Sequence, residues 1–292
     1  MNDLLMYGSR VQRADELTPV QKIGDLLFKR DDLYMPFGAR EVNGGKLRQA
    51  YMLVESVKDR YKGVVSCCSI HSPQAPITAA VCRAFGLPCV IYYGGTTKAR
   101  LLELPMPKLC LKYGAKVVIA AKSGRHNILY SNARKYAEKA NFFVVEYGIN
   151  LEEHQDILLN AIANQVANIP DELDNLVITC GSGITSSGVM IGLARYNKKV
   201  KRIHLVATAP DRRQLIRRIQ RENGVNVEFE YHDLFHRKSF VYEKGLTADY
   251  NGIVLHPNYE AKSISWLMNE SGIDLQNEKT MLWVVGSKPI VQ

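Results

Sequence analysis

Short runs of apolar and β-branched residues alternate along the chain with amphipathic stretches of helical period. The apolar runs predict strands at residues 63–68, 88–93, 116–120, 142–146, 175–179, 202–208 and 280–285. The helical stretches predict helices at residues 46–59, 75–85, 106–112, 123–140, 154–168, 187–196, 212–223 and 260–271. Strands joined by helices in this order are typical of parallel sheets, so the pattern predicts the α/β class.

The length of 292 residues allows either one large domain or two ordinary ones. No linker rich in Pro or Gly divides the chain, and no internal repeat is present. Two domains would therefore have to be built one into the other. We expect residues 1–49 and 147–292 to form the larger domain, and residues 50–146 to form a smaller domain inserted in it.

Composition is that of a globular protein, with 46% hydrophobic residues. No apolar run approaches the roughly 20 residues that cross a bilayer, and residues 1–13 lack the apolar centre of a secretory signal. The six cysteines form no Cys-x-x-Cys pair, which favours reduced, buried thiols over a disulfide framework. We expect a cytoplasmic protein without a membrane partner.

The chain carries a net charge of +9, from 38 Lys and Arg against 29 Asp and Glu. Ten of the basic residues lie between Arg195 and Arg221, where Asp211 is the single acid. This basic stretch is typical of a solvated helix face or of a surface that binds a polyanion such as nucleic acid. Both interpretations remain open on the sequence.

The segment Asn43-Gly44-Gly45-Lys46 combines two glycines with a lysine. A glycine pair lets the backbone approach a bound ring closely, and an activated lysine amine can bind an aldehyde. A loop glycine pair followed by a solvated lysine would look the same. Lys46 is therefore a candidate Schiff-base lysine.

A second candidate site follows the predicted strand at 175–179. Glycines and hydroxyl residues form a turn between this strand and the next helix, as in phosphate sites at helix N-termini. The spacing is not Gly-x-Gly-x-x-Gly and no Walker lysine follows, which favours a single phosphate monoester over a nucleotide. A turn without a ligand is the alternative. The predicted binding residues are Gly181, Ser182, Gly183, Ile184, Thr185 and Ser186.

Two further helix starts carry polar side chains. Ser72 and Gln74 lie in a turn that suits a carboxylate, and Tyr259 and Glu260 open a helix after a turn containing proline. Ordinary helix caps would explain both patterns equally well.

One histidine pair has the spacing of metal ligands. His232 and His236 stand four residues apart with Asp233 between them, but no third ligand is evident nearby. We interpret them as surface histidines and expect no metal.

Taken together, these pieces resemble the fold-type II pyridoxal-phosphate enzymes, whose fold is like that of the tryptophan synthase β subunit. The likeness is greatest to the group that contains aminocyclopropane-carboxylate deaminase and D-cysteine desulfhydrase, and it spans roughly residues 18 to 290. It rests on motifs in the family's order. These are Thr18-Pro19-Val20, Lys29-Arg30-Asp31-Asp32, Lys46, the loop 181–188 and the run from His256 to Ser263.

The resemblance implies a pyridoxal 5'-phosphate (PLP) cofactor in a homodimeric enzyme. Lys46 would form the Schiff base, and the segment 181–186 would hold the phosphate. Tyr259 would approach the substrate, and Glu260 would lie near the pyridine nitrogen. Ser72 would bind the substrate carboxylate, although Ser72-Pro73-Gln74 departs from the family's usual Ser-Asn-His or Ser-Asn-Gln.

The implied activity is that of a PLP-dependent lyase, deaminase or decarboxylase acting at Cα of an amino acid. The chain also looks loosely like phage-encoded PLP proteins of thymine hypermodification. In that alternative the substrate is an amino acid attached to thymine in DNA, the basic stretch grips phosphates, and the protein works in the host cytoplasm. A non-catalytic PLP carrier is a third alternative, which the combination of Lys46, Tyr259 and Glu260 disfavours.

Overall fold

The computed structural model describes residues 12–38, 40–121, 125–149, 152–241, 244–247 and 249–287. The chain divides into two compact units. Of the described residues, unit 1 comprises those within 12–14 and 35–157, and unit 2 comprises those within 15–34 and 158–287. The chain thus leaves unit 2 after Tyr34 and returns to it at Leu158. These bounds differ from those expected from the sequence, because the helix that follows Gly44 packs in unit 1.

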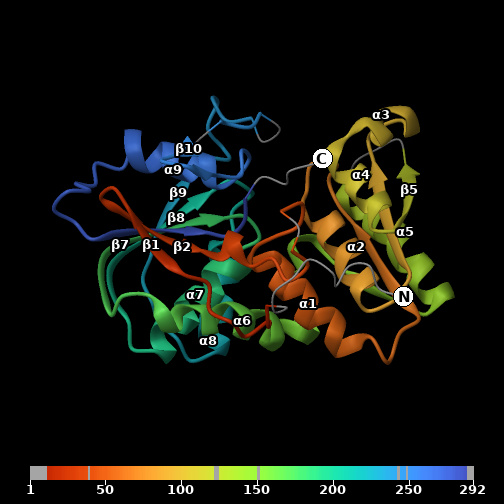
Figure 1. Ribbon diagram of the computed structural model, residues 1–292, viewed down its shortest axis with the longest axis horizontal. Helices are drawn as coiled ribbons and strands as arrows, with labels where there is room; N and C mark the ends of the chain where they lie inside the picture. The colour runs from red at the N-terminus through yellow and green to blue at the C-terminus, as the bar shows by residue number, and fades with distance from the viewer. Residues whose placement is uncertain are drawn as a thin grey trace. The chain divides into compact units, whose positions relative to one another are not determined.

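Unit 2 contains a six-stranded sheet with the order β1-β2-β12-β7-β8-β9 (Figure 1). All neighbouring strands are parallel except β1 and β2, which form an antiparallel hairpin. The hairpin turn is tight because Gly24 has a φ of 58°. The strands are β1 (Val20–Ile23), β2 (Leu26–Arg30), β7 (Glu172–Cys180), β8 (Lys199–Ala207), β9 (Glu230–Asp233) and β12 (Thr280–Val284).

Helices cover both faces of this sheet, as Figure 1 shows. α7 (Ile184–Arg195) and α8 (Arg213–Glu222) lie on one face, and α9 (Glu260–Asn269) lies on the other. Right-handed crossovers explain this division, because the chain steps from β7 to β8 to β9 in one direction and then returns through α9 to β12. The core under α9 is built from buried aliphatic and aromatic side chains of that helix and of β2, β8 and β12.

Unit 1 contains a four-stranded parallel sheet with the order β5-β4-β3-β6. Its strands are β3 (Gly63–Cys67), β4 (Cys89–Gly94), β5 (Lys116–Ala121) and β6 (Phe142–Val145). α5 packs on β3 and the strands beside it, and α1 packs against α2. The helices are α1 (Gly45–Val57), α2 (Gln74–Ala84), α3 (Lys98–Glu103), α4 (Pro105–Lys112) and α5 (His126–Ala140).

The remaining elements are short, apart from α6 (Gln155–Ala163), which begins in unit 1 and continues into unit 2. The two-residue strands β10 (Asp249–Tyr250) and β11 (Ile253–Val254) pair antiparallel. Short 3₁₀ helices complete the order: η2 (Asp31–Leu33), η3 (Tyr147–Ile149), η4 (Glu152–His154) and η5 (Asn164–Asn168).

The predicted α/β class with parallel sheets is confirmed. Every predicted strand and helix is present with small shifts at its ends, and the predicted 154–168 helix continues from α6 into η5. The sequence pattern did not reveal β1, β2, β9 or α3. All six cysteines are buried and free, and none of the helices in the described ranges is long and apolar enough to cross a bilayer.

Candidate functional site

The predicted site residues divide between the two units. Lys46, Ser72 and Gln74 belong to unit 1, whereas the segment 181–186, Tyr259 and Glu260 belong to unit 2. In both units they lie at the carboxyl ends of parallel strands, which is where open α/β sheets bind their ligands.

In unit 2, the segment 181–186 joins the end of β7 to the start of α7. Gly183 has a φ of 88°, a conformation that favours glycine and that lets the chain turn sharply into the helix. The first-turn N–H groups of a helix have no acceptor within it, so those of Ile184, Thr185 and Ser186 face the turn. A side chain added at Gly181 would meet no atom within 4 Å, so the turn borders open space. The segment therefore has the form of an anion cradle.

Three buried polar atoms around this cradle have no hydrogen-bond partner of nitrogen or oxygen in the protein. They are Ser186 Oγ, Thr208 Oγ1 and Arg212 Nε. The Thr208 backbone N–H donates to Cys180 O at 3.0 Å, and Arg212 Cβ would lie 3.3 Å from a Cβ at Gly183. Buried polar groups are almost always satisfied, so unpartnered atoms beside a turn of free N–H groups fit a bound anion.

The electrostatics of Cys180 agree with this placement of Arg212. Burial raises the pKa of the Cys180 thiol to about 11, and the hydrogen bond from Ser186 and the positive charge of Arg212 offset part of that rise. Sequence reasoning assigned neither Thr208 nor Arg212 to the cradle. The available signal was that both follow the predicted strand 202–208, whose parallel pairing with β7 brings their carboxyl ends together.

Glu260 lies at the same edge of the sheet in unit 2. It is 3% exposed in the first turn of α9, and its Oε1 accepts a hydrogen bond from the backbone N–H of Val285 at 3.2 Å, just after β12. Ser263 and Thr179 hydroxyls, 2.7 Å apart, fix α9 to β7. The N-terminus of a helix stabilises a carboxylate in its charged form.

Tyr259, the residue before Glu260, is partly exposed, and its ring lies 4.7 Å from that of His256. The cradle, Tyr259 and Glu260 therefore lie at one edge of the unit 2 sheet.

In unit 1, Lys46 is the second residue of α1, a helix that begins directly after Gly44, whose φ is 92°. Its positive charge opposes the increase that burial causes in the pKa of the Cys68 thiol, which places Lys46 near the carboxyl end of β3. The turn that follows Cys68 contains Ser72, whose Oγ accepts from the Gln74 N–H at 3.3 Å. Lys46 and Ser72 thus lie at the same end of the unit 1 sheet.

Gln74 is fully used by the protein itself. Its Nε2 donates to Glu146 O at 2.6 Å and to Ser66 Oγ at 3.3 Å, and its Oε1 accepts from the Gly148 N–H at 2.7 Å. The side chain is 1% exposed. In this structure Gln74 therefore fixes the start of α2 to the segment after β6.

The N-terminal motif residues of unit 2 form a buried network. Lys29 Nζ donates to Thr18 O and to Asn168 Oδ1, each at 2.7 Å. Asp31 accepts from Thr18 Oγ1 at 2.8 Å and from Trp283 Nε1 at 3.1 Å. These motif residues thus hold β2 against β12 and η5.

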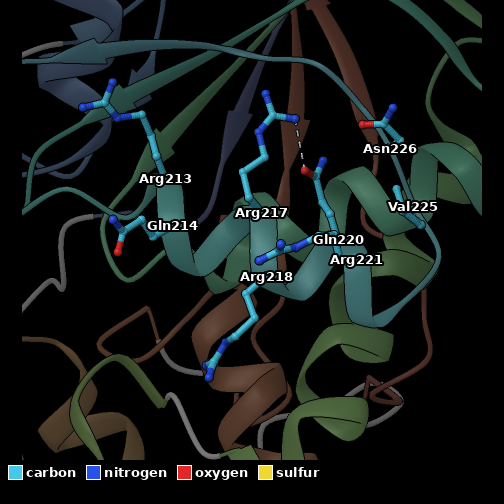
Figure 2. Close-up of a pocket in the computed structure, with 8 residues that line it drawn as sticks. All are labelled: Arg213, Gln214, Arg217, Arg218, Gln220, Arg221, Val225 and Asn226. Atoms are coloured by element: carbon cyan, nitrogen blue, oxygen red, sulfur yellow. Dashed lines mark hydrogen bonds between the residues drawn. The ribbon is translucent and has the colours of Figure 1, made fainter.

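The basic stretch 195–221 separates into two groups in the structure. Lys199 and Lys201 lie at the amino end of β8 and pair with Glu172 at 3.6 Å and Asp174 at 2.6 Å. The arginines of α8 instead begin beside the cradle, because α8 follows the carboxyl end of β8. Together with neighbouring residues they line an open groove, formed by Arg213, Gln214, Arg217, Arg218, Gln220, Arg221, Val225 and Asn226 (Figure 2).

The two histidines singled out in the sequence have different surroundings. His236 is exposed, and its Nδ1 lies 2.7 Å from Asp233 Oδ2. His232 is half-buried and lies beside His204 and Glu230. Burial lowers the pKa values of both His204 and His232.

Comparison with known proteins relates most of the chain to one family. Residues 4–233 match the family model described as pyridoxal-phosphate dependent enzyme. A curated relative, the O-seryl-dTMP PLP-dependent decarboxylase of Salmonella phage ViI, is 27% identical over 91% of this chain and 78% of its own length. A putative 1-aminocyclopropane-1-carboxylate deaminase of Thermotoga maritima is 25% identical over 97% of this chain and 94% of its own.

Solved structures agree on the fold. An ACC deaminase homologue matches with a TM-score of 0.75 at 21% identity, over 97% of this chain and 93% of its own. Serine racemase from Dictyostelium discoideum matches with a TM-score of 0.59 at 17% identity, over 94% and 93%. The family model covers well over half of the chain, and the parallel sheets agree with the fold of the matched structures. The chain therefore belongs to the pyridoxal-phosphate dependent enzymes and uses PLP as its cofactor.

Proposed function

We propose that this PLP enzyme removes the carboxylate of an amino acid that is attached to a thymine nucleotide in DNA. The observation that carries the proposal is the set of arginines along α8, namely Arg213, Arg217, Arg218 and Arg221. This helix begins at the cradle, since Arg212 lies beside Gly183. The similarity to the phage decarboxylase, whose name specifies O-seryl-dTMP, supports the same substrate class.

The unit 2 cradle fits the phosphate of PLP. The free N–H groups at the start of α7 point towards it, and Ser186 Oγ and Thr208 Oγ1 are buried donors without a nitrogen or oxygen acceptor in the protein. Arg212 adds a positive charge to the same place. We therefore assign the phosphate to residues 181–186, with Thr208 and Arg212 as additional ligands.

Lys46 is the lysine we assign to covalent attachment of the cofactor. When bound, PLP supplies an electron sink for the pair released at Cα. Once the substrate's amine has displaced it, the Lys46 amine is free to move a proton at Cα. Glu260 places a carboxyl group in a buried position at the N-terminus of α9, which suits a hydrogen bond to a protonated pyridine nitrogen.

The proposed reaction balances without a further reagent. The bond between Cα and the carboxylate breaks, CO₂ leaves, and a proton from Lys46 replaces it at Cα. Ser72, in the turn after Cys68, would bind the carboxylate before it leaves, and Tyr259 would contact the rest of the amino acid. The product is the corresponding amine, still attached to the nucleotide.

The ion pairs of Arg213 and Arg217 leave these two arginines of α8 able to bind phosphates. Arg213 pairs with Asp211 at 2.7 Å and Arg217 with Glu228 at 2.6 Å, both with exposed side chains. Exposed pairs of this kind contribute only about 0–1 kcal/mol, so a phosphodiester can replace the carboxylate at little cost. Figure 2 shows Arg213 and Arg217 extending to one side of α8 and Arg218 to the other. The helix therefore offers positive charge on more than one side to a nucleic acid backbone.

The direct test is incubation of the holoenzyme with O-seryl-dTMP and with DNA that contains this nucleotide. We expect mass spectrometry to show loss of CO₂ from the modified nucleotide, and Lys46→Arg to abolish that loss. Reduction with borohydride, followed by peptide mapping, should place a pyridoxyl group on Lys46 and not on Lys58 at the end of the same helix. A label on another lysine would refute the assignment of Lys46.

Binding to DNA is tested by the dependence of affinity on salt. In a plot of the logarithm of the binding constant against the logarithm of the salt concentration, each phosphate contact on duplex DNA adds about −0.9 to the slope. Arg217→Gln and Arg218→Gln should each make the slope less negative by about 1. Lys199→Gln and Lys201→Gln are the matched controls, because they remove charge from the opposite end of β8. Equal effects of the two pairs would refute α8 as the DNA surface.

A second candidate is deamination of a free small amino acid. The similarity to a putative 1-aminocyclopropane-1-carboxylate deaminase favours it. In this case the same incubation with free amino acids would release ammonia and a 2-oxo acid, and O-seryl-dTMP would remain intact. That result would refute the nucleotide-linked amino acid as the substrate, but it would not contradict the assignment of PLP as the cofactor.

A further inference from the structure

We propose that His204, His232 and Glu230 form a binding site for a divalent transition-metal ion of the zinc type. His204 comes from β8, and the other two residues come from the adjacent strand β9. The site lies on the face of the unit 2 sheet that α9 covers, where both imidazoles contact the Trp266 ring, at 5.5 and 4.2 Å between centroids. It uses none of the residues that we assign to PLP or substrate.

The spacing of the three candidate ligand atoms is that of a tetrahedral site. His204 Nδ1 lies 3.1 Å from His232 Nε2 and 3.4 Å from Glu230 Oε2, and the last two atoms are 3.7 Å apart. Ligands at zinc distances of about 2.0–2.2 Å in tetrahedral geometry are separated from one another by about 3.3–3.6 Å. The three atoms therefore need only small shifts to meet one ion, and a water would complete its coordination.

Hydrogen bonding fixes the tautomer of His204 in the form that ligates a metal. Asn175 Nδ2 donates to Glu278 Oε2 at 3.0 Å and to Thr280 Oγ1 at 3.1 Å, so its Oδ1 faces His204 Nε2 at 3.1 Å. His204 must therefore carry its proton on Nε2, which leaves the lone pair of Nδ1 directed at the other two residues. A metal-bound histidine commonly donates its second N–H to an oxygen in this way.

Two lone-pair atoms therefore face each other across 3.4 Å, His204 Nδ1 and Glu230 Oε2. A proton on His232 Nε2 bonds well to one of them, whereas a cation attracts all three ligand atoms at once. The nearby cations Arg202 and Arg237 are each paired with a carboxylate, of Glu278 and Glu270 respectively. They therefore leave little net positive charge to oppose an ion.

The experiment uses the full-length holoenzyme after treatment with a chelator. Zn²⁺ is added in competition with a chromophoric chelator, and Co²⁺ is added separately to record its visible absorption and the quenching of tryptophan emission. We expect one equivalent of Zn²⁺ per chain, a Co²⁺ spectrum of tetrahedral intensity, and quenching by Co²⁺ because the Trp266 ring lies 4.2 Å from that of His232.

The variants separate this site from other metal-binding groups. Glu230→Gln and His232→Gln should each weaken Zn²⁺ binding at least tenfold, and since both side chains are partly exposed, neither should prevent folding. His236→Gln is the matched control, because His236 pairs with Asp233 outside the cluster. Absence of stoichiometric binding in the wild type, or equal loss in His236→Gln, would overturn the proposal and leave a hydrogen-bonded triad. PLP binding is measured in parallel, so the outcome does not depend on the proposed reaction.

Discussion

Replacing Ser186 with Ala should have opposite consequences for the empty and the PLP-loaded protein. Ser186 Oγ is buried, and it interacts with the Cys180 thiol, a weak acceptor. A buried polar group that lacks a good partner costs roughly 1–3 kcal/mol, so its removal should leave the free energy of unfolding of the apoprotein unchanged or raise it by up to about 1 kcal/mol. If the hydroxyl instead donates to the cofactor's phosphate, its loss removes a charge-assisted hydrogen bond of about 1.5–3 kcal/mol. Affinity for the phosphate should then fall by roughly 10- to 150-fold.

The neighbouring Ser187 provides a matched control. Its Oγ is equally buried but donates to Gly183 O at 2.9 Å, so the protein already satisfies it. Ser187→Ala should therefore destabilise the apoprotein by about 0.5–1.5 kcal/mol, the net value of an ordinary hydrogen bond. Its effect on phosphate affinity should be much smaller than that of Ser186→Ala.

Urea unfolding of the apoproteins measures the first quantity, and titration with pyridoxamine 5'-phosphate measures the second. This ligand shares the phosphate and the ring of PLP but cannot form an imine with a lysine, so it measures the non-covalent binding, and the comparison of Ser186→Ala with Ser187→Ala isolates the contribution of the cradle. At a fixed ligand concentration well above Kd, a tenfold weaker affinity removes about 1.4 kcal/mol of ligand-induced stabilisation. If Ser186→Ala destabilised the apoprotein and bound the ligand normally, the assignment of the cradle would be refuted.

Three further changes test other parts of the structure. Arg212→Gln should lower the affinity for pyridoxamine 5'-phosphate at low salt by about 10-fold or more, because it removes a charged hydrogen bond. An unchanged affinity in calorimetric titration would show that Arg212 does not contact the phosphate. Glu260→Gln keeps an acceptor for its backbone partner but removes the negative charge, so turnover should fall by roughly 10- to 150-fold while the thermal midpoint changes little. Gly192→Ala should destabilise the protein by about 1–3 kcal/mol in urea, because the new Cβ would lie 2.4 Å from Val166 Cγ2, and a wild-type midpoint would contradict that packing.

The sequence predicted those parts of the candidate site that are local in the chain. The strand ending at Cys180, the glycine turn and the helix that follows are contiguous, so pattern and composition together reveal them. The same is true of the helix that begins at Glu260. In such segments the residues that specify the turn and the polar residues assigned to the site are neighbours in the sequence, so one local pattern reveals both.

The features that were missed depend on pairing between distant segments. Arg212 reaches the cradle because β7 and β8 are parallel neighbours, which no local pattern specifies. His204, which the sequence analysis did not connect with His232, is 28 residues from it and meets it through the β8–β9 register. The β1–β2 hairpin was missed for another reason, because its strands are short and the turn at Gly24 is its strongest local signal.

Helix α9 connects the two sites argued from unit 2. Its first residue, Glu260, lies at the carboxyl edge of the sheet, and Trp266 lies six residues further on, or about 9 Å along the helix axis. Trp266 rests on the imidazoles of β8 and β9, and Ser263 bonds to Thr179 between these two points. A metal ion that fixed His204 and His232 would therefore also restrict the position of Glu260 relative to the cradle. Because a misplacement of about 1 Å can cost a hundredfold in rate, chelation should lower turnover even though the ion touches neither cofactor nor substrate.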